Sequence, residues 1–236
     1  MPRFVDLSGE AKLVPDLVAQ ARERVPVVCS LTGHNVCGAE LLRPDPWQWH
    51  VCISGFWQRI GEPSGMWKVS QKLNHLHGPR SRVVLLQWND CMWSAAEWIW
   101  LTSNGKGQRI NVYAYSWGGG WGAMEFAREC RKRQMKVESM VLSDAVYRSP
   151  ILPPWIVFNP LSLSSLYRPR IKVPDNVMNL WAFRQTSNRP SGHQFILSEN
   201  TRLQQETVLT DGVEHSYMDD LPAFHDKCVE VSEMIR

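Results

Sequence analysis

The sequence predicts an α/β protein in which a mostly parallel central sheet carries helices on both faces. From residue 49 onward, short runs rich in β-branched residues alternate with longer segments of helical periodicity. Some of these runs are almost continuously apolar, as is usual for strands buried on both sides of a parallel sheet. The chain has 236 residues, 44% of them hydrophobic and 21% charged, so we expect one domain over residues 1–236.

Six strands and four helices follow from these patterns in chain order. The predicted strands are 50–56, 82–88, 109–116, 137–146, 176–183 and 206–211. The predicted helices are 63–77, 93–101, 118–134 and 221–235. The apolar residues expected to pack on the sheet include Met66, Val69, Leu73 and Leu76 in the first helix, Trp93, Ala96 and Trp100 in the second, and Ala123, Phe126, Ala127 and Cys130 in the third. The first 48 residues give only a short helix near Leu17 and a strand or turn at 25–33, without clear boundaries.

Between the fourth and fifth predicted strands, the chain makes a long excursion at 147–175. The segment is rich in proline and in large apolar residues. We expect a lid-like insertion that covers a site and lines an acyl pocket. The alternative is that these residues pack on the sheet as a second small core.

The composition argues against several classes of protein. The charges are scattered and sum to +3, so the sequence shows no basic stripe of the kind that binds nucleic acids. No apolar stretch is long enough for a membrane helix, and the N-terminus lacks the apolar core of a signal peptide, so we expect a cytoplasmic protein without a membrane span. The six cysteines include no CxxC pair, which favours reduced, mostly buried thiols. We expect no cofactor and no metal, because Cys29, His34, Cys37 and Cys52 lack zinc-site spacing and no phosphate-loop motif occurs.

The segment YAYSWGGGWGA, residues 113–123, carries the most informative motif. Ser116 follows a predicted strand and precedes a glycine-rich helix start, with Ala114 two residues before it and Gly118 two residues after it. A serine on such a sharp turn has a strained backbone, and small residues at these two positions avoid a clash across the turn. The helix start would place N–H groups and a favourable dipole beside the hydroxyl. The alternative is a glycine-rich packing turn with an incidental serine.

This motif and the order of elements resemble the α/β-hydrolase family. The likeness covers residues 49–236, and Ala114 replaces the first glycine of the nucleophile elbow, as in some small lipases of that family. Hydrolase-like proteins of phages and bacteria also look similar. The resemblance implies a Ser nucleophile, then an Asp or Glu, then a His along the chain.

The expected general base is His215, which lies between the last predicted strand and the closing helix. The expected acid is Asp144, after the fourth strand, as in a subset of the family's lipases. The more usual place, after the fifth strand, holds no Asp or Glu before Glu199. Asp90 and Asp211 remain alternatives, and Asp144 could instead cap a turn.

Two backbone N–H groups would have to hold the oxyanion. The resemblance implies Trp117, directly after the nucleophile, and Phe56, in the turn after the early strand, with Gly55 allowing that turn.

These residues predict a serine hydrolase that cleaves carboxylic esters through an acyl-enzyme, with a small-molecule acyl ester as substrate. The alternatives are an acyltransferase that uses the same residues, and a non-catalytic hydrolase-like protein that keeps the fold as a binding or scaffolding surface.

Overall fold

The computed structural model describes residues 48–56, 58, 63–77, 81–103, 109–147 and 169–234, and the backbone of four short strands nearer the N-terminus. These strands pair antiparallel in two small sheets, β1 with β2 and β3 with β4. Their bounds are β1 (Arg3–Val5), β2 (Ala11–Leu13), β3 (Val28–Cys29) and β4 (His34–Asn35). The helix expected near Leu17 and the thiols of Cys29 and Cys37 lie outside the described residues.

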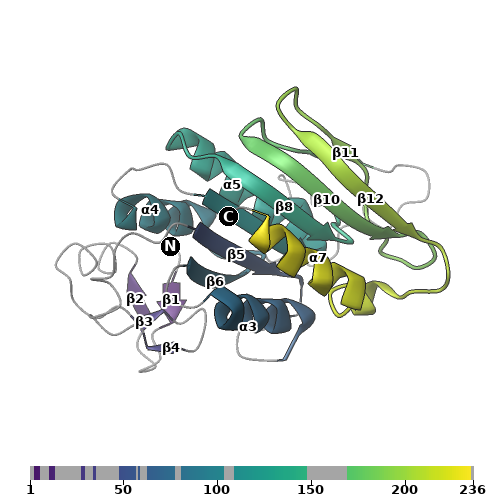
Figure 1. The fold of residues 1–236 in the computed structure, drawn as a ribbon, viewed down its shortest axis with the longest axis horizontal. Coiled ribbons are helices and arrows are strands. Elements are labelled where there is room, and N and C mark those ends of the chain that lie inside the picture. Colours follow the sequence, from purple (N-terminus) through teal and green to yellow (C-terminus); the bar gives the residue numbers. More distant parts are fainter. Residues whose placement is uncertain are drawn as a thin grey trace.

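A six-stranded parallel sheet forms the centre of the described structure (Figure 1). Its order is β12-β10-β8-β7-β5-β6, and each of the pairings in it is parallel. The strands are β5 (Gln48–Ser54), β6 (Ser81–Gln87), β7 (Arg109–Tyr115), β8 (Val137–Ser143), β10 (Val177–Gln185) and β12 (Arg202–Leu209). The chain passes from β5 to β6 at one edge and then returns to place β7 on the other side of β5. This reversal brings loops from both directions to the carboxyl ends of the central strands, where open α/β sheets bind ligands.

Helices cover both faces of this sheet, as the sequence predicts (Figure 1). Helices α3 (Gly65–His77) and α7 (Pro222–Glu233) pack on one face, and α4 (Met92–Thr102) and α5 (Ala123–Lys132) pack on the other. The strands are buried on both sides, so successive residues enter different cores. Along β5, for example, Ile53 belongs to the α4/α5 core and Cys52 to the α3/α7 core.

The expected packing face of α4 is right for Ala96, which is buried, and wrong for the two tryptophans. Trp93 and Trp100 are 49% and 37% exposed, whereas the helix buries Met92, Ser94, Ala95, Ala96 and Ile99. The segment is apolar on nearly all sides, so periodicity alone does not select a face. The small Ala95 and Ala96 let the helix approach its neighbours closely, and the Trp93 ring instead faces the Arg133 guanidinium. In α3, Leu76 is also exposed, at 44%, because it lies in the last turn of the helix.

Some other boundaries differ from the prediction. Strand β12 begins at Arg202, four residues before the predicted start, since its first half is an exposed polar edge that lacks an apolar pattern. Strands β9 (Ile171–Lys172) and β11 (Phe195–Ile196) form a small parallel pair that the sequence does not suggest. Most of the expected lid at 147–175 lies outside the described residues, and its role stays a prediction.

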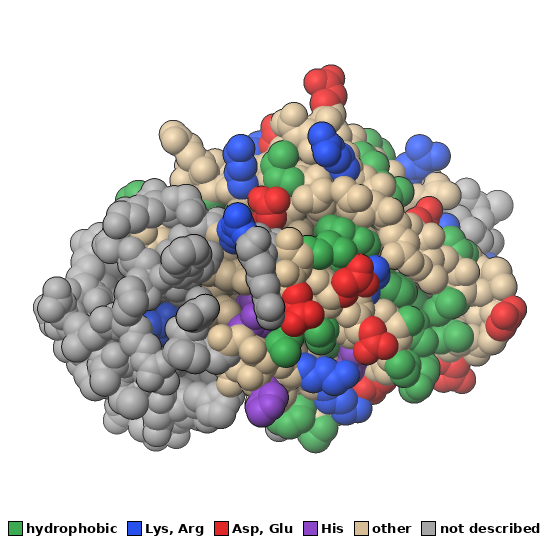
Figure 2. All heavy atoms as spheres, viewed as in Figure 1, with side chains coloured by type: hydrophobic (Ala, Val, Ile, Leu, Met, Phe, Trp, Pro, Cys, Tyr) green, Lys and Arg blue, Asp and Glu red, His purple; other side chains and the backbone are tan. Residues whose placement is uncertain are grey.

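The described helices are all too short or too polar to cross a membrane. On the face shown in Figure 2, acidic and basic side chains are interspersed among apolar ones.

Candidate active site

The glycine-rich motif forms a sharp turn at the carboxyl end of β7. Ser116 follows the strand with φ of 55°, in the left-handed region, and is 5% exposed. A five-residue π-helical turn, Gly118–Gly122, comes next and leads into α5. A Cβ at Gly118 would lie 2.5 Å from the carbonyl oxygen of Ser54, so the position two residues after the serine, where the sequence predicts a small residue, requires glycine.

The strand order, together with this elbow after a central strand, decides the architecture. The chain has an α/β-hydrolase fold. Among the described residues, the hydrolase-like sheet runs from β5 to β12, which matches the extent of the resemblance in the sequence.

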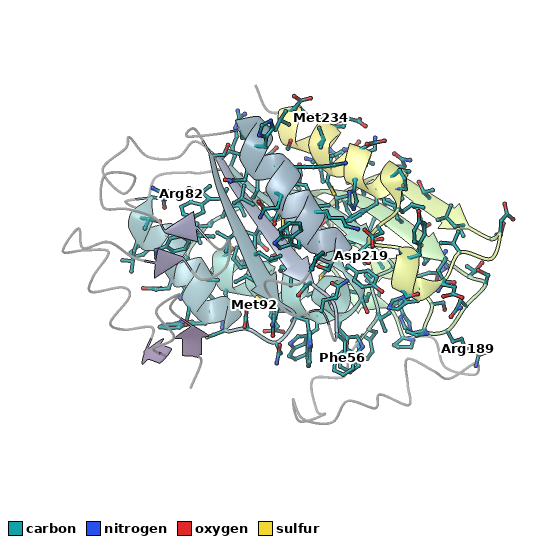
Figure 3. All side chains as sticks on the ribbon, turned by 90° about the horizontal axis from the view of Figure 1, so that it is seen from below. Phe56, Arg82, Met92, Arg189, Asp219 and Met234 are labelled. Atoms are coloured by element: carbon teal, nitrogen blue, oxygen red, sulfur yellow. The ribbon has the colours of Figure 1, made fainter. Side chains whose placement is uncertain are left out.

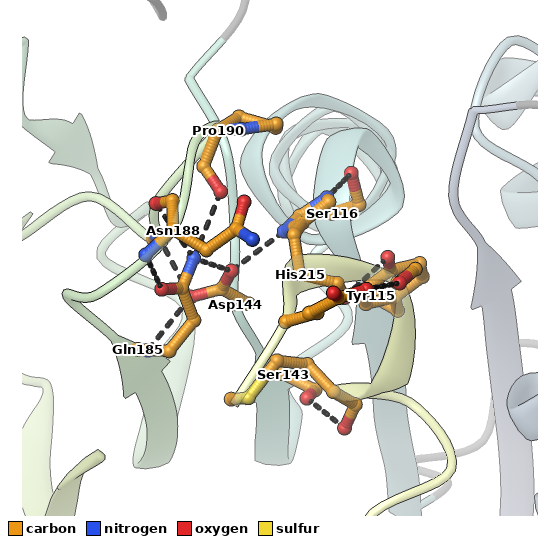
Figure 4. Close-up of polar contacts among 12 residues, drawn as sticks. Tyr115, Ser116, Ser143, Asp144, Gln185, Asn188, Pro190 and His215 are labelled. Atoms are coloured by element: carbon orange, nitrogen blue, oxygen red, sulfur yellow. Dashed lines mark hydrogen bonds and ion pairs between the residues drawn. The ribbon is translucent and has the colours of Figure 1, made fainter. Parts of the chain in front are cut away.

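Ser116, His215 and Asp144 form one line of hydrogen bonds (Figure 4). The Ser116 Oγ lies 2.8 Å from His215 Nε2, and His215 Nδ1 lies 2.6 Å from Asp144 Oδ2. Because a carboxylate accepts, the proton of a neutral imidazole belongs on Nδ1, and Nε2 is left to accept from the serine hydroxyl. The arrangement presents the serine to a base that a carboxylate orients.

Asp144 is fully buried at the end of β8, and each of its oxygens accepts two hydrogen bonds. Oδ1 accepts the backbone N–H of Gln185 at 2.9 Å and that of Gly192 at 2.8 Å. Oδ2 accepts the Gln185 side-chain amide at 3.0 Å in addition to His215. A Cβ at Gly192 would lie 2.4 Å from Oδ1, so only glycine lets this loop close on the carboxylate. Four donors fix the carboxylate and stabilise its charge.

Gln185 and Gly192 are functional residues that sequence reasoning missed. Gln185 ends β10, the place where the resemblance implies an acid, and its amide also donates to the carbonyl groups of Asn188 and Pro190. Its Oε1 accepts the N–H of Asn188 at 2.7 Å. No sequence motif indicates this network; the one signal is a polar residue at the place where the family more often has its carboxylate.

The two alternative acids lie elsewhere. Asp90 accepts the backbone N–H of Gln87 at 2.8 Å, which closes the turn between β6 and α4. Asp211 is exposed and bonds the hydroxyl of Thr210. The carboxylate bonded to His215 is Asp144.

The loop that carries His215 is fixed to the ends of two strands. The Tyr115 hydroxyl donates to the carbonyl oxygen of His215 at 2.8 Å, and the two rings stack with centroids 5.1 Å apart. Ser143 donates to the carbonyl oxygen of Met218 at 2.6 Å. Burial raises the pKa of Tyr115, so its hydroxyl remains a donor at physiological pH. These contacts hold the imidazole over the elbow.

The two expected oxyanion donors lie on segments that meet beside Ser116. Phe56 is in the turn after β5, and Trp117 directly follows the serine; their rings are 4.7 Å apart. A Cβ at Gly55 would lie 2.9 Å from the Cβ of Ser116, so the turn packs directly on the elbow. The Trp88 ring packs on both, with centroids 4.9 Å from Trp117 and 6.0 Å from Phe56. Figure 3 shows Phe56 near the lower edge of the view, beyond the carboxyl end of β5.

The described metal-ligating side chains are dispersed, and most of the described thiols are buried. In this part of the chain, no three His, Cys, Asp or Glu side chains gather to hold an ion. The described cysteines, of which Cys52, Cys130 and Cys228 are buried, form no disulfide. Burial raises the pKa of these three thiols, which keeps them protonated.

Comparisons with known proteins find similarity at the level of structure. No protein-family model and no curated protein sequence matches the chain. ClbQ from the colibactin NRPS/PKS pathway is similar over 80% of this chain and 96% of its own, with 11% identity and a TM-score of 0.43. A candidate hydrolase from Agrobacterium vitis S4 is similar over 82% and 90%, with 12% identity and a TM-score of 0.48. RedJ is similar over 81% and 92%, with 13% identity and a TM-score of 0.41. These likenesses carry no argument about function, which depends on the site itself.

Proposed function

We propose that this protein is a serine hydrolase that cleaves carboxylic esters through an acyl-enzyme. The observation that carries the proposal is the continuous hydrogen-bonded line from Ser116 through His215 to the buried Asp144. A serine hydroxyl is a weak nucleophile unless an oriented base removes its proton, and this line supplies both the base and the group that orients it.

The geometry supports the following sequence of steps. His215 Nε2 takes the Ser116 proton while Oγ attacks the ester carbonyl, and Asp144 stabilises the resulting imidazolium. The backbone N–H groups of Trp117 and Phe56 hold the oxyanion of the tetrahedral intermediate. His215 then gives its proton to the departing alkoxide. Water, activated by the same imidazole, attacks the acyl-enzyme and releases the acid.

The substrate class is a small-molecule ester with an apolar acyl group. Both proposed oxyanion donors carry aromatic side chains, and these pack with Trp88 and Val146 in one apolar cluster next to the nucleophile. An apolar acyl chain that enters beside Ser116 would meet this cluster rather than charged groups.

A fluorophosphonate probe tests the proposal, because it reacts with serines activated in this way. We expect labelling of the wild-type protein and its loss in Ser116→Ala. Ser198→Ala changes a serine in the turn after β11, bonded to Thr201, and serves as the matched control that keeps full labelling. A series of p-nitrophenyl esters of increasing chain length would then define the acyl preference. Absence of labelling in a folded wild-type protein would instead support a non-catalytic scaffold.

A further inference from the structure

The loop that carries His215 is joined to the turn that carries Phe56 by two side chains, the buried Asp219 and the half-buried Gln58. Asp219 follows His215 by four residues and is 1% exposed. Its Oδ2 accepts the side-chain amide of Gln58 at 2.5 Å. The other end of the same amide, Gln58 Oε1, accepts the backbone N–H of Gly55 at 2.9 Å. A polar connection thus runs from the base loop to the residue just before the proposed oxyanion donor.

Gln58 holds the two peptide groups that flank Gly55, the Ser54–Gly55 group through its side chain and the Gly55–Phe56 group through its backbone. Its side chain binds the Gly55 N–H, and its own backbone N–H donates to the Gly55 carbonyl oxygen at 3.4 Å. In a trans peptide, the carbonyl and the following N–H point in opposite directions. When the Gly55 carbonyl is directed toward Gln58, the Phe56 N–H is therefore directed away from it.

Asp219 determines which way the Gln58 amide is oriented. A carboxylate only accepts, so the Gln58 NH₂ group must face Asp219 and its oxygen must face the Gly55 N–H. Burial raises the pKa of Asp219, and the hydrogen bond from Gln58 partly offsets this effect. The orientation of the Gln58 amide therefore depends on the hydrogen bond between the two side chains.

Helices α3 and α7 both contribute groups that hold Asp219 in this place. The N–H of Met66, in the first turn of α3, reaches Oδ2 at 3.3 Å. His225 donates to the Asp219 carbonyl oxygen at 2.7 Å. A Cβ at Gly65 would lie 2.1 Å from the same oxygen, so the loop can approach the start of α3 only because residue 65 is glycine.

We propose that Gln58 and Asp219 are positioning residues that hold the Phe56 N–H in the orientation needed to bind the oxyanion. They also fix the position of this N–H group relative to His215. The inference rests on the proposed hydrolase function. Neither residue touches the reacting atoms. Their effect should appear in the chemical step, because an oxyanion donor acts on charge that develops only in the transition state.

The first test removes the connection. Gln58→Leu keeps most of the side-chain volume but cannot bridge Asp219 and Gly55. We expect kcat for p-nitrophenyl butyrate to fall about 10- to 100-fold with KM within about threefold of wild type, somewhat less than the 10²- to 10³-fold loss for removing one oxyanion donor. A kcat within threefold of wild type would overturn the proposal.

The second test reverses the polarity of the connection. Gln58→Glu places a second carboxylate against Asp219, and two carboxylates this close cannot both ionise without repulsion, so kcat should fall at least as far as in Gln58→Leu. In the double variant Gln58→Glu, Asp219→Asn, the new asparagine amide can donate to the new carboxylate, which still accepts the Gly55 N–H. Only the longer bond from the Met66 N–H, at 3.3 Å, loses its acceptor. We expect kcat to recover to within about tenfold of wild type with KM within threefold in the single and the double variant, whereas a connection that only holds the site together would move KM along with kcat.

The matched control makes the same two chemical changes at exposed positions. Gln205→Glu, Asp211→Asn alters an exposed glutamine on the edge strand β12 and an exposed aspartate that bonds Thr210, and both kinetic constants should stay at wild-type values. If Gln58→Leu does not fold, the comparison of the single Gln58→Glu with its double variant decides, and a double no more active than the single would refute the idea. Loss of all labelling and turnover in the wild type would refute the proposed function itself, whereas an active wild type with unaffected Gln58 variants would refute only the positioning role.

Discussion

Replacing Asp144 with asparagine should reverse the tautomer of His215. The backbone N–H groups of Gln185 and Gly192 both point at Oδ1, so the asparagine oxygen must stay there and its NH₂ group must take the place of Oδ2. That NH₂ group donates toward His215 Nδ1, which can then only accept, and the ring proton moves to Nε2. Facing Ser116, Nε2 becomes a donor and can no longer remove the serine proton.

The size of the effect follows from this geometry. Loss of the base typically costs three to four orders of magnitude in kcat, as the same exchange does in serine proteases, or about 4–5.5 kcal/mol of transition-state stabilisation. The free energy of unfolding should also fall, because the new NH₂ group and the Gln185 side-chain NH₂ group are both donors and face each other in a fully buried site. A buried donor without an acceptor costs about 1–3 kcal/mol. Gln185 cannot turn its amide to compensate without losing its bonds to Asn188 and Pro190.

The assay is steady-state hydrolysis of p-nitrophenyl butyrate, with urea unfolding in parallel. Asp90→Asn and Asp211→Asn are the controls, since these carboxylates bond Gln87 and Thr210 instead of His215, and both should retain kcat within about threefold of wild type. An Asp144→Asn variant with more than a tenth of wild-type kcat would refute the reasoning, as would an Asp211→Asn variant that is equally impaired.

Three further predictions concern the base, the elbow and the core. His215→Ala should lower kcat at least 10³-fold. Its free energy of unfolding should stay within about 1 kcal/mol of wild type, because the hydrogen bond from Tyr115 goes to the backbone of residue 215. A variant with normal turnover would count against the assigned base. Gly120→Ala should lower the free energy of unfolding, measured in urea, by several kcal/mol, since its Cβ would lie 1.9 Å from the Val146 carbonyl oxygen. Gly212→Ala, at a residue with φ of 70° and open space around it, should cost only about 1–2 kcal/mol. Equal losses in the two variants would contradict this reasoning. Burial lowers the pKa of His50 from 6.5 to about 3, so the stability from keeping it neutral is present above pH 6.5 and is lost as the pH falls toward 3. His50→Gln should remove a slope of up to about 1.4 kcal/mol per pH unit from unfolding measured between pH 4 and 6, and an unchanged slope would exclude this group as its source.

The sequence by itself was enough to predict the parallel sheet with helices on both faces, and to pick out Ser116 as a residue at a sharp strand-to-helix turn. Both depend on short-range physics. Apolar periodicity distinguishes buried strands from helices. The small residues Ala114 and Gly118 indicate a sharp turn, because larger side chains would clash across it. In α4, the prediction was right for Ala96 but wrong for Trp93 and Trp100, because a helix that is apolar on nearly all sides has no periodic pattern that selects one face.

Only the tertiary structure decided which carboxylate meets His215. Asp90, Asp144 and Asp211 each follow a strand or lie near the histidine in the sequence, and no local pattern separates them. The contact of Asp144 with a residue 71 positions away is set by the placement of β8 next to β10 and by the loop that closes on it through Gln185 and Gly192. The link between Asp219 and Gln58, 161 positions apart, likewise arises from strand order. Long-range hydrogen bonds of this kind depend on how the elements are arranged in space, which the spacing of residues along the chain does not encode.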